Sequence, residues 1–187
     1  MRIITGKAKG LKLKTPKGFL TRPTSDRIKE SLFNILNGIF DFDDKKILDL
    51  FAGTGALGLE AISRGSSHAV FVDFQTTSII RDNCINAHFI DESEIFKLDI
   101  FRAITKFSAQ NKQFDLIFCD PPYNKGLCEK TLMEIDKLNL LAPDGLFIAE
   151  HGANESIEVN FYNYKIENLR QIKYGNTTTI DIFKRID

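Results

Sequence analysis

The chain has 187 residues, of which 43% are hydrophobic, enough for one α/β domain with a sizeable core. Its 25 Lys and Arg residues balance 25 Asp and Glu residues, so the net charge is zero. No apolar run approaches the roughly 20 residues that span a bilayer, and the basic N-terminus lacks the apolar core of a secretory signal. We therefore expect a cytoplasmic protein with no membrane contact.

The cysteine and histidine residues show no pattern of a disulfide framework or a metal site. Three cysteines are an odd number, and none lies at the Cys-x-x-Cys spacing of structural zinc sites. The three histidines are scattered along the chain. We expect no bound metal.

The zero net charge conceals a division along the chain. Residues 1–29 contain nine basic residues and one acid, a net charge of +8, whereas the remainder carries −8. A basic segment on an acidic body is typical of a protein that grips a phosphate backbone. One alternative is a solvated hairpin whose lysines only confer solubility. For Arg27, another alternative is an ion pair with Glu30 across one helical turn. The candidate RNA contacts are Arg2, Lys7, Lys9, Lys12, Lys14, Arg22 and Arg27.

The N-terminal part predicts a small extension. Residues 1–6 and 11–14 alternate well enough for two short strands joined by the segment between Gly6 and Gly10. A basic connector follows, and then a helix capped by Thr24 or Ser25, with apolar residues at helical spacing up to Ile39. We expect residues 1–40 to form an RNA-binding extension and residues 41–187 the catalytic domain.

Strand and helix patterns alternate from Ile47 onward. Continuous apolar strands separated by helices indicate a doubly wound, Rossmann-like α/β fold with a mostly parallel sheet and helices on both faces. Two more strands, near 161–171 and 178–185, are expected to close a seven-stranded sheet as an antiparallel hairpin. The other strands are predicted near 47–51, 69–73, 94–98, 114–119 and 145–150, and the helices near 56–64, 76–88, 101–109 and 126–138.

A glycine-rich turn follows the first of these strands. Gly53 and Gly55, with Gly58 three residues on, match the pattern that lets a backbone approach a nucleotide at a helix N-terminus. Asp73 ends the next strand and is placed for ribose hydroxyls. The pattern favours a nucleoside-bearing cofactor; a tight structural turn is the alternative, and helix packing explains Gly58 equally well.

The most specific motif is Asp120-Pro121-Pro122-Tyr123, directly after the apolar run 114–119. Prolines restrict the backbone and donate no hydrogen bond, so the turn is stiff and its carbonyls stay free. Asp120 and the Pro121 carbonyl are then placed to accept from an exocyclic amine, while Tyr123 stacks on the ring that bears it. Tyr123 as a core aromatic is the alternative. The motif predicts a site for a nucleobase amine.

These motifs together resemble the class I S-adenosylmethionine-dependent methyltransferases, over about residues 45–187. That resemblance implies a cofactor loop containing Asp49, Phe51, Gly53 and Gly55, with Asp49 orienting the loop or meeting the methionine ammonium. It also implies ribose binding by Asp73 and the methylation of an exocyclic amine at Asp120. Asp99 would take the adenine amine, with Ile100 or Phe101 against the ring; an N-cap role for Asp99 is equally compatible.

A narrower resemblance runs nearly from end to end. The chain is similar to the bacterial 16S ribosomal RNA guanine-N2 methyltransferase family, often called RsmD, in several segments beside the Asp120 turn. This resemblance implies methylation of 16S rRNA, in an assembled or partly assembled small subunit, by a protein that we expect to be monomeric. The family usually has Glu where Asp73 stands. The matching segments are residues 2–7, 13–16, 21–27, 29–30, 57–61, 63–65 and 174–175.

Three other functions are weighed against this one. A DNA amine methyltransferase also uses an Asp- or Asn-Pro-Pro-Tyr turn, but such enzymes usually add a sizeable recognition segment. An NAD-dependent dehydrogenase explains the glycines and leaves Asp120 unexplained. A non-catalytic RNA-binding module on a methyltransferase fold is expected to lack Asp49, Gly53 or Asp120, and all three are present.

Overall fold

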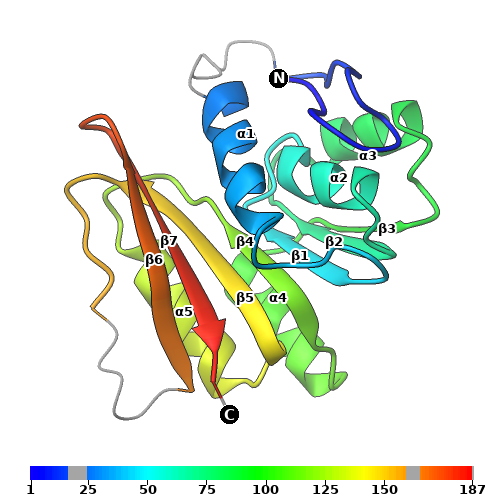
Figure 1. Ribbon diagram of the computed structural model, residues 1–187. Helices are drawn as coiled ribbons and strands as arrows, with labels where there is room; N and C mark the ends of the chain where they lie inside the picture. The colour runs from blue at the N-terminus through cyan, green and yellow to red at the C-terminus, as the bar shows by residue number, and fades with distance from the viewer. Residues whose placement is uncertain (17–24, 159–164, 187) are drawn as a thin grey trace. The chain divides into compact units, whose positions relative to one another are not determined.

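The computed structural model describes residues 1–16, 25–158 and 165–186, so Arg22 and the expected cap Thr24 lie outside the described residues. It divides into two compact units, Met1–Lys97 (unit 1) and Leu98–Asp187 (unit 2). Unit 1 contains α1 (Ser25–Leu36), β1 (Lys46–Leu50), α2 (Ala56–Ser63), β2 (His68–Val72), α3 (Thr77–Asn86) and β3 (Ser93–Phe96) (Figure 1). Unit 2 contains α4 (Ile100–Ala109), β4 (Phe114–Cys119), α5 (Leu127–Lys137), β5 (Leu141–Gly152), β6 (Ile166–Tyr174) and β7 (Thr178–Arg185).

The strands confirm the expected fold class. They follow the order β3-β2-β1-β4-β5-β7-β6 in a seven-stranded sheet. The described pairs are parallel between β1 and β2, β2 and β3, and β4 and β5, whereas β7 runs antiparallel to both β5 and β6. The sheet is therefore mostly parallel with one antiparallel hairpin. No described helix is long and apolar enough to cross a membrane.

In unit 1 the three parallel strands form the core. β1 and β2 are buried at every position after the first, as expected for strands covered on both faces. α2 packs against β1 and β2, and α3 packs against β3. α1 buries Leu32, Phe33 and Leu36 from one face, and the Phe33 ring stacks on Phe42 with centroids 5.7 Å apart. The helical spacing of apolar residues thus correctly predicted this buried face.

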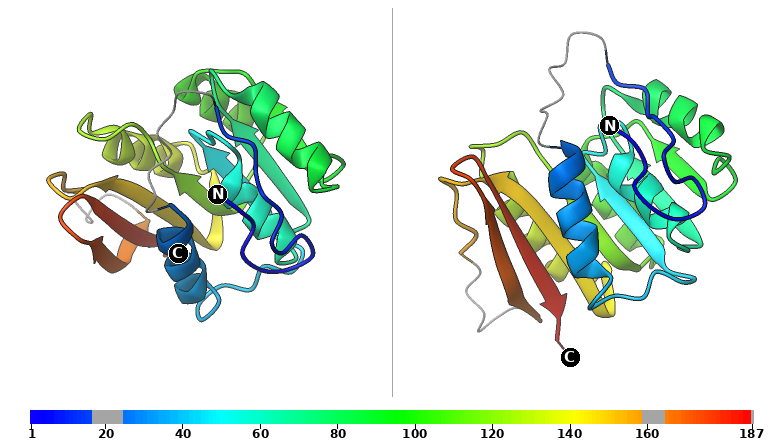
Figure 2. Two further views of the ribbon diagram at one scale, coloured as in Figure 1. Left: turned by 90° about the horizontal axis from the view of Figure 1, so that it is seen from above. Right: turned by 45° about the horizontal axis from the view of Figure 1, so that its top comes forward.

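The N-terminal segment, residues 1–14, pairs antiparallel as expected but forms no regular strand. Arg2 and Lys12 form an isolated antiparallel bridge, flanked by hydrogen bonds from the Ile3 amide to the Leu11 carbonyl, 2.9 Å, and from the Leu13 amide to the Met1 carbonyl, 3.1 Å. The backbone also bonds to α2, where the Lys7 amide donates to the Ser63 carbonyl over 2.8 Å. Gly6 lies so close to that helix, with φ of 85°, that a Cβ atom would overlap Ser63. The expected pairing is therefore present as a short hairpin that holds one bridge and no regular strand, since part of its backbone bonds to α2; Figure 2 shows the segment beside α2 and α3.

Unit 2 combines two parallel strands with the antiparallel hairpin. β5 begins four residues before the predicted strand and ends two residues after it. The hairpin strand β6 begins at Ile166 instead of about residue 161, and residues 159–164 lie outside the described part of the chain. α5 packs on β5, and the rings of Phe147 and Phe183 meet between β5 and β7, 6.4 Å apart.

The compact units do not divide the chain at residue 40. Residues 1–40 and the first three strands share unit 1. The proposed division concerns which residues bind RNA, and contacts within a unit do not test it. An RNA-binding extension at 1–40 on a catalytic domain at 41–187 stays a prediction.

Candidate functional site

The glycine loop lies directly after β1. Phe51, Gly53 and Gly55 have positive φ angles of 57°, 56° and 77°, which reverse the chain within a few residues. Such angles are easy for glycine and costly for phenylalanine. The Gly55 amide closes the turn by donating to the Ala52 carbonyl over 2.7 Å, and α2 begins at the next residue. The loop therefore presents backbone amides and a helix N-terminus at the carboxyl end of β1, where α/β sheets bind ligands.

Asp49 in β1 bonds to the first turn of α2, the helix that follows the loop. Its carboxylate accepts a 2.9 Å hydrogen bond from the Gly58 amide in the first turn of α2, and only 2% of the residue is exposed. Burial, reinforced by the charge of Asp73 and opposed by the Gly58 hydrogen bond, raises the pKa of Asp49 to about 7. A Cβ atom on Gly58 would lie 2.4 Å from the Phe71 ring, so this glycine serves packing.

Asp73 joins the loop to the end of β2. One carboxylate oxygen accepts from the Gly53 amide over 3.0 Å, and the other accepts from Gln75 and Thr76 at 2.7 and 2.9 Å. A carboxylate has about four lone-pair sites, so these three hydrogen bonds leave room for a ribose hydroxyl. Ribose binding by Asp73 stays a prediction. The next residue, Phe74, is 65% exposed. We did not single out Phe74 from the sequence, although an aromatic directly after the acid was a usable signal for ring binding.

Asp99 begins α4 as its N-cap. Its side chain accepts hydrogen bonds from the Phe101 and Arg102 amides, at 3.0 and 3.2 Å, which confirms the capping alternative. Ile100 is only 6% exposed, whereas Phe101 is half-buried and its ring centroid lies 4.4 Å from the Lys130 ammonium nitrogen. The adenine contacts of Asp99 and Ile100 stay predictions, and Phe101 offers the more accessible surface.

The Asp120 turn follows β4 in unit 2. Asp120 and Pro122 are exposed, whereas Pro121 is buried. The Tyr123 ring is half-buried, and its hydroxyl donates to the Glu150 carboxylate over 2.8 Å, with Thr178 at 3.3 Å. Burial and the nearby Glu150 charge raise the pKa of Tyr123, so the phenol stays neutral. The roles of these four residues toward a nucleobase are untested and stay predictions.

Glu155 holds the segment after Tyr123. One carboxylate oxygen accepts from the Lys125 and Gly126 amides at 3.1 Å, and the other accepts from Gly152 at 3.0 Å. Burial alone would raise the pKa of Glu155, but the hydrogen bonds from backbone amides outweigh burial and lower it. Sequence reasoning missed this residue because its partners at 125 and 126 lie about 30 positions away.

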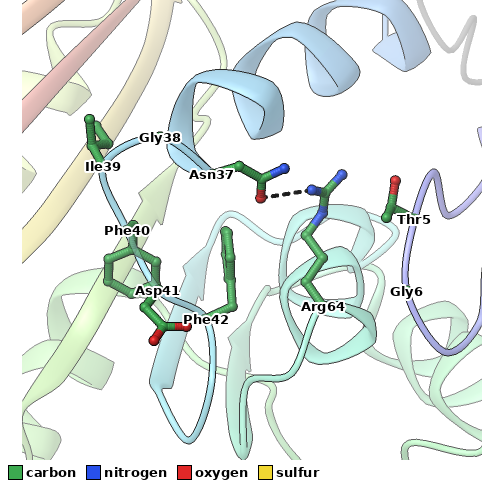
Figure 3. Close-up of a pocket in the computed structure, with 9 residues that line it drawn as sticks. All are labelled: Thr5, Gly6, Asn37, Gly38, Ile39, Phe40, Asp41, Phe42 and Arg64. Atoms are coloured by element: carbon green, nitrogen blue, oxygen red, sulfur yellow. Dashed lines mark hydrogen bonds between the residues drawn. The ribbon is translucent and has the colours of Figure 1, made fainter.

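A separate hollow of about 580 Å³ lies in unit 1 (Figure 3). Arg64 donates there to the Asn37 side chain over 3.0 Å, and its Nε atom bonds to Glu60. None of the predicted site residues lines the hollow, so the hollow does not bear on those predictions. The lining residues are Thr5, Gly6, Asn37, Gly38, Ile39, Phe40, Asp41, Phe42 and Arg64.

The candidate RNA contacts in the described part of the chain lie at the surface. Lys14 pairs with Asp82 on α3 over 3.0 Å and keeps more than half of its side chain exposed. The RNA roles of these residues stay predictions, and Arg22 lies outside the described residues. The others, all exposed, are Arg2, Lys7, Lys9, Lys12 and Arg27.

Comparison with known proteins places the chain among bacterial relatives. Residues 1–183 match the family model described as "Conserved hypothetical protein 95". The YlbH protein of Bacillus subtilis is 39% identical over 153 residues, which cover 81% of this chain and 82% of YlbH. Ribosomal RNA small subunit methyltransferase D of Escherichia coli is 34% identical over 155 residues, covering 80% of this chain and 74% of that protein.

Solved structures agree with this grouping. The YhhF protein of Escherichia coli superposes with a TM-score of 0.81 at 28% identity, over 100% of this chain and 98% of that one. The chain therefore belongs to the family described as "Conserved hypothetical protein 95", which includes the Ribosomal RNA small subunit methyltransferase D proteins and confirms the family resemblance seen in the sequence.

Proposed function

We propose that this protein transfers a methyl group from S-adenosylmethionine to the exocyclic N2 amine of a guanosine in 16S rRNA. Membership of the family supports ribosomal RNA methylation in general. The observation that carries the finer proposal is the turn after β4, where an exposed Asp120 follows a buried strand and precedes two prolines and an anchored Tyr123. This arrangement suits a planar aromatic amine.

The glycine loop fits the cofactor. Asp49 is a buried carboxylate with its pKa raised to about 7, and a nearby ammonium group would stabilise its ionised form. A Cβ atom on Gly53 would meet only one atom within 4 Å, so the backbone there is open to close approach. Bound S-adenosylmethionine supplies an electrophilic methyl group on a sulfonium. Asp73 and Phe74 would contact its ribose and adenine.

The Asp120 turn fits the acceptor amine. The Asp120 carboxylate and the Pro121 carbonyl would accept from the two N–H bonds, which aims the nitrogen lone pair at the methyl group. An aryl amine is a poor nucleophile because its lone pair is delocalised, so alignment matters most; positioning can supply roughly 7–11 kcal/mol. Asp120 or water would take the proton that the amine loses when it receives the methyl group.

The RNA would reach the site through a flipped base and phosphate contacts. Tyr123 would stack on the base while its hydroxyl stays anchored on Glu150. The exposed lysines of the N-terminal segment would bind the backbone, so RNA binding should weaken steeply with added salt. We propose that the protein acts as a monomer in the cytoplasm, on a small subunit that is assembled or partly assembled.

Transfer of labelled methyl from S-adenosylmethionine tests the proposal. The substrates are unmethylated small subunits, naked 16S rRNA and duplex DNA, and the modified nucleoside is identified by mass spectrometry. We expect N2-methylguanosine in RNA. Label in DNA would favour a DNA amine methyltransferase, and cofactor binding with no label in any substrate would favour a non-catalytic RNA-binding module.

A further inference from the structure

Both ends of the N-terminal segment are linked to Thr54, the residue between the two loop glycines: Met1 contacts it directly, and Lys14 through Asn83. The Thr54 hydroxyl donates to the Met1 sulfur over 3.3 Å. At the other end, the Asn83 side-chain amide donates to the Thr54 carbonyl over 2.9 Å and to the Lys14 carbonyl over 3.1 Å. Thr54 is 8% exposed, so these contacts are largely shielded from water. A segment expected to bind RNA thus contacts the cofactor loop directly through Met1 and indirectly, through Asn83, at Lys14.

Asn83 connects three parts of unit 1 through one side chain. It projects from α3, is fully buried, and also accepts a 2.7 Å hydrogen bond from the Lys14 amide. Its carbonyl oxygen and both amide hydrogens are therefore used in described hydrogen bonds. No apolar or differently shaped side chain can make the same three bonds. Asn83 is a specific connector between α3, Lys14 and Thr54.

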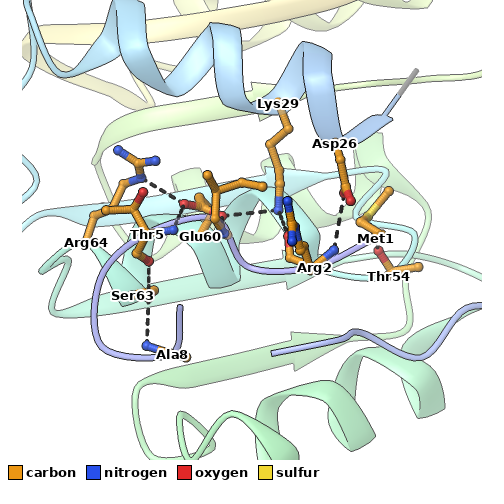
Figure 4. A network of polar contacts seen from close by, with 12 residues as sticks. Met1, Arg2, Thr5, Ala8, Asp26, Lys29, Thr54, Glu60, Ser63 and Arg64 are labelled. Atoms are coloured by element: carbon orange, nitrogen blue, oxygen red, sulfur yellow. Dashed lines mark hydrogen bonds and ion pairs between the residues drawn. The ribbon is translucent and has the colours of Figure 1, made fainter. Parts of the chain in front are cut away.

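The middle of the segment is fixed on α2, the helix that follows the loop (Figure 4). The Glu60 carboxylate accepts from the Ile4 and Thr5 amides at 2.7 and 3.0 Å. It also pairs with Lys29 at 3.2 Å and with Arg64 at 3.0 Å, and none of the three side chains is more than 5% exposed. The middle of the segment is therefore fixed on α2 by a buried carboxylate and its two cations.

We propose that Asn83 is a positioning residue for the cofactor loop, and that the N-terminal segment is part of the cofactor site through it. The loop needs external support because it contains positive φ angles, including that of Phe51, that cost free energy unless neighbours impose them. Asn83 holds the loop at the Thr54 carbonyl and holds the segment that covers Thr54. The ligand named here, S-adenosylmethionine, rests on the proposed function.

Replacing Asn83 by alanine tests this proposal, with Asn86→Ala as the matched control. Asn86 lies on the same helix but is exposed. Calorimetry without RNA should show at least about tenfold weaker cofactor binding for Asn83→Ala, since buried polar groups lose their partners. The KM for the cofactor should rise by a similar factor with kcat at saturation nearly unchanged. Amide exchange should accelerate at Gly53 and Gly58, while Asn86→Ala matches the wild type in every measurement.

A purely structural Asn83 would give a different result. Asn83→Ala would then unfold at a lower temperature but bind the cofactor within twofold of the wild type when folded, and the proposal would be overturned. The binding assay needs no RNA. If the wild-type protein binds the cofactor but methylates no RNA, the proposed function is contradicted, and the effect of Asn83→Ala on cofactor binding can still be measured.

A second variant covers the case in which Asn83→Ala does not fold. The Ser63 hydroxyl accepts from the Ala8 amide at 3.0 Å and donates to the Thr5 carbonyl at 2.6 Å. Ser63→Ala therefore loosens the segment without touching Thr54. We expect roughly threefold weaker cofactor binding, from the loss of ordinary hydrogen bonds. Unchanged affinity together with faster amide exchange in residues 4–8 would show that the segment moves independently of the loop, against the proposal.

Discussion

The glycine loop of unit 1 and the Asp120 turn of unit 2 obtain their shape from different sources. The loop is held by side chains of other elements, Asp73 at the end of β2 and Asn83 on α3. The turn carries much of its own stiffness, because two consecutive prolines restrict its backbone, and Glu155 fixes the residues just after it. Substitutions around the loop should therefore disturb cofactor binding from a distance, whereas the turn should be sensitive mainly at its own residues.

Substitution of Asp120 tests whether the Asp120 turn acts independently of cofactor binding. Asp120→Ala should lower methyl transfer by about 10²–10⁴, because an acceptor for the amine and its proton is lost, while cofactor affinity stays within a few-fold. Asp120→Asn keeps a carbonyl acceptor and removes only the basic group. Single-turnover rates and calorimetry measure both effects. A large loss of cofactor affinity in Asp120→Ala would show that this residue supports cofactor binding and would contradict the comparison.

Substitution of Glu60 tests whether contacts between α2 and the N-terminal segment stabilise unit 1. Glu60→Ala leaves the buried Lys29 and Arg64 without their carboxylate, so the free energy of unfolding should fall by about 3–5 kcal/mol. The exposed Glu30 on α1 is the matched control, with an expected change within about 0.5 kcal/mol. Denaturant titration measures both. Equal changes in the two variants would contradict the role of Glu60 in fixing the N-terminal segment.

Two substitutions of Tyr123 in unit 2 separate the proposed role of its ring, stacking on a base, from that of its hydroxyl, which bonds to Glu150. Tyr123→Ala should weaken substrate binding by about 1–3 kcal/mol, the usual contribution of stacking on a base. Tyr123→Phe keeps the ring and loses the hydrogen bond to Glu150, so the loss should be smaller. The KM for RNA measures the difference. If Tyr123→Phe lost as much as Tyr123→Ala, anchoring rather than stacking would be the function of this side chain.

A smaller effect is expected from the protonation of Asp49. With a pKa of about 7 in the free protein, Asp49 is mostly neutral below pH 7, whereas the cofactor ammonium favours its ionised form. Cofactor binding then releases a proton below pH 7, and affinity should rise about eightfold from pH 6 to pH 7.5. Calorimetry over this range measures it. Asp49→Asn should abolish this dependence; a slope that persists in Asp49→Asn would assign the titration to another group.

The exposed lysines are expected to give the smallest individual effects. Each substitution of Lys7, Lys9 or Lys12 by alanine should reduce the salt dependence of RNA binding by about one unit of slope. Lys14→Ala should change it less, since Lys14 is already paired with Asp82. Binding titrations at several salt concentrations compare these variants. A slope unaffected by all three substitutions would remove the N-terminal segment from the RNA interface.

Local patterns in the sequence determined the elements and the chemistry-bearing motifs. Alternating apolar strands and helices predicted the sheet, and Asp49, Gly53 and Asp120 were singled out because each lies in or just after an apolar strand, near glycines or prolines that set the turn. The charge distribution also predicted lysines exposed at the N-terminus. These features depend on neighbours within a few positions of the chain, which is the range over which turn geometry and strand burial are decided.

Only the tertiary structure decided how the N-terminal segment is used. The bond from Asn83 to Thr54 spans 29 residues and that to Lys14 spans 69, while Glu60 meets Ile4 across 56. No local pattern indicates such partners, because a buried asparagine or glutamate on a helix has the same neighbours in sequence whether or not a distant segment reaches it. Their hydrogen bonds form only when packing brings the segments together, since a buried polar group must find a partner wherever the fold supplies one.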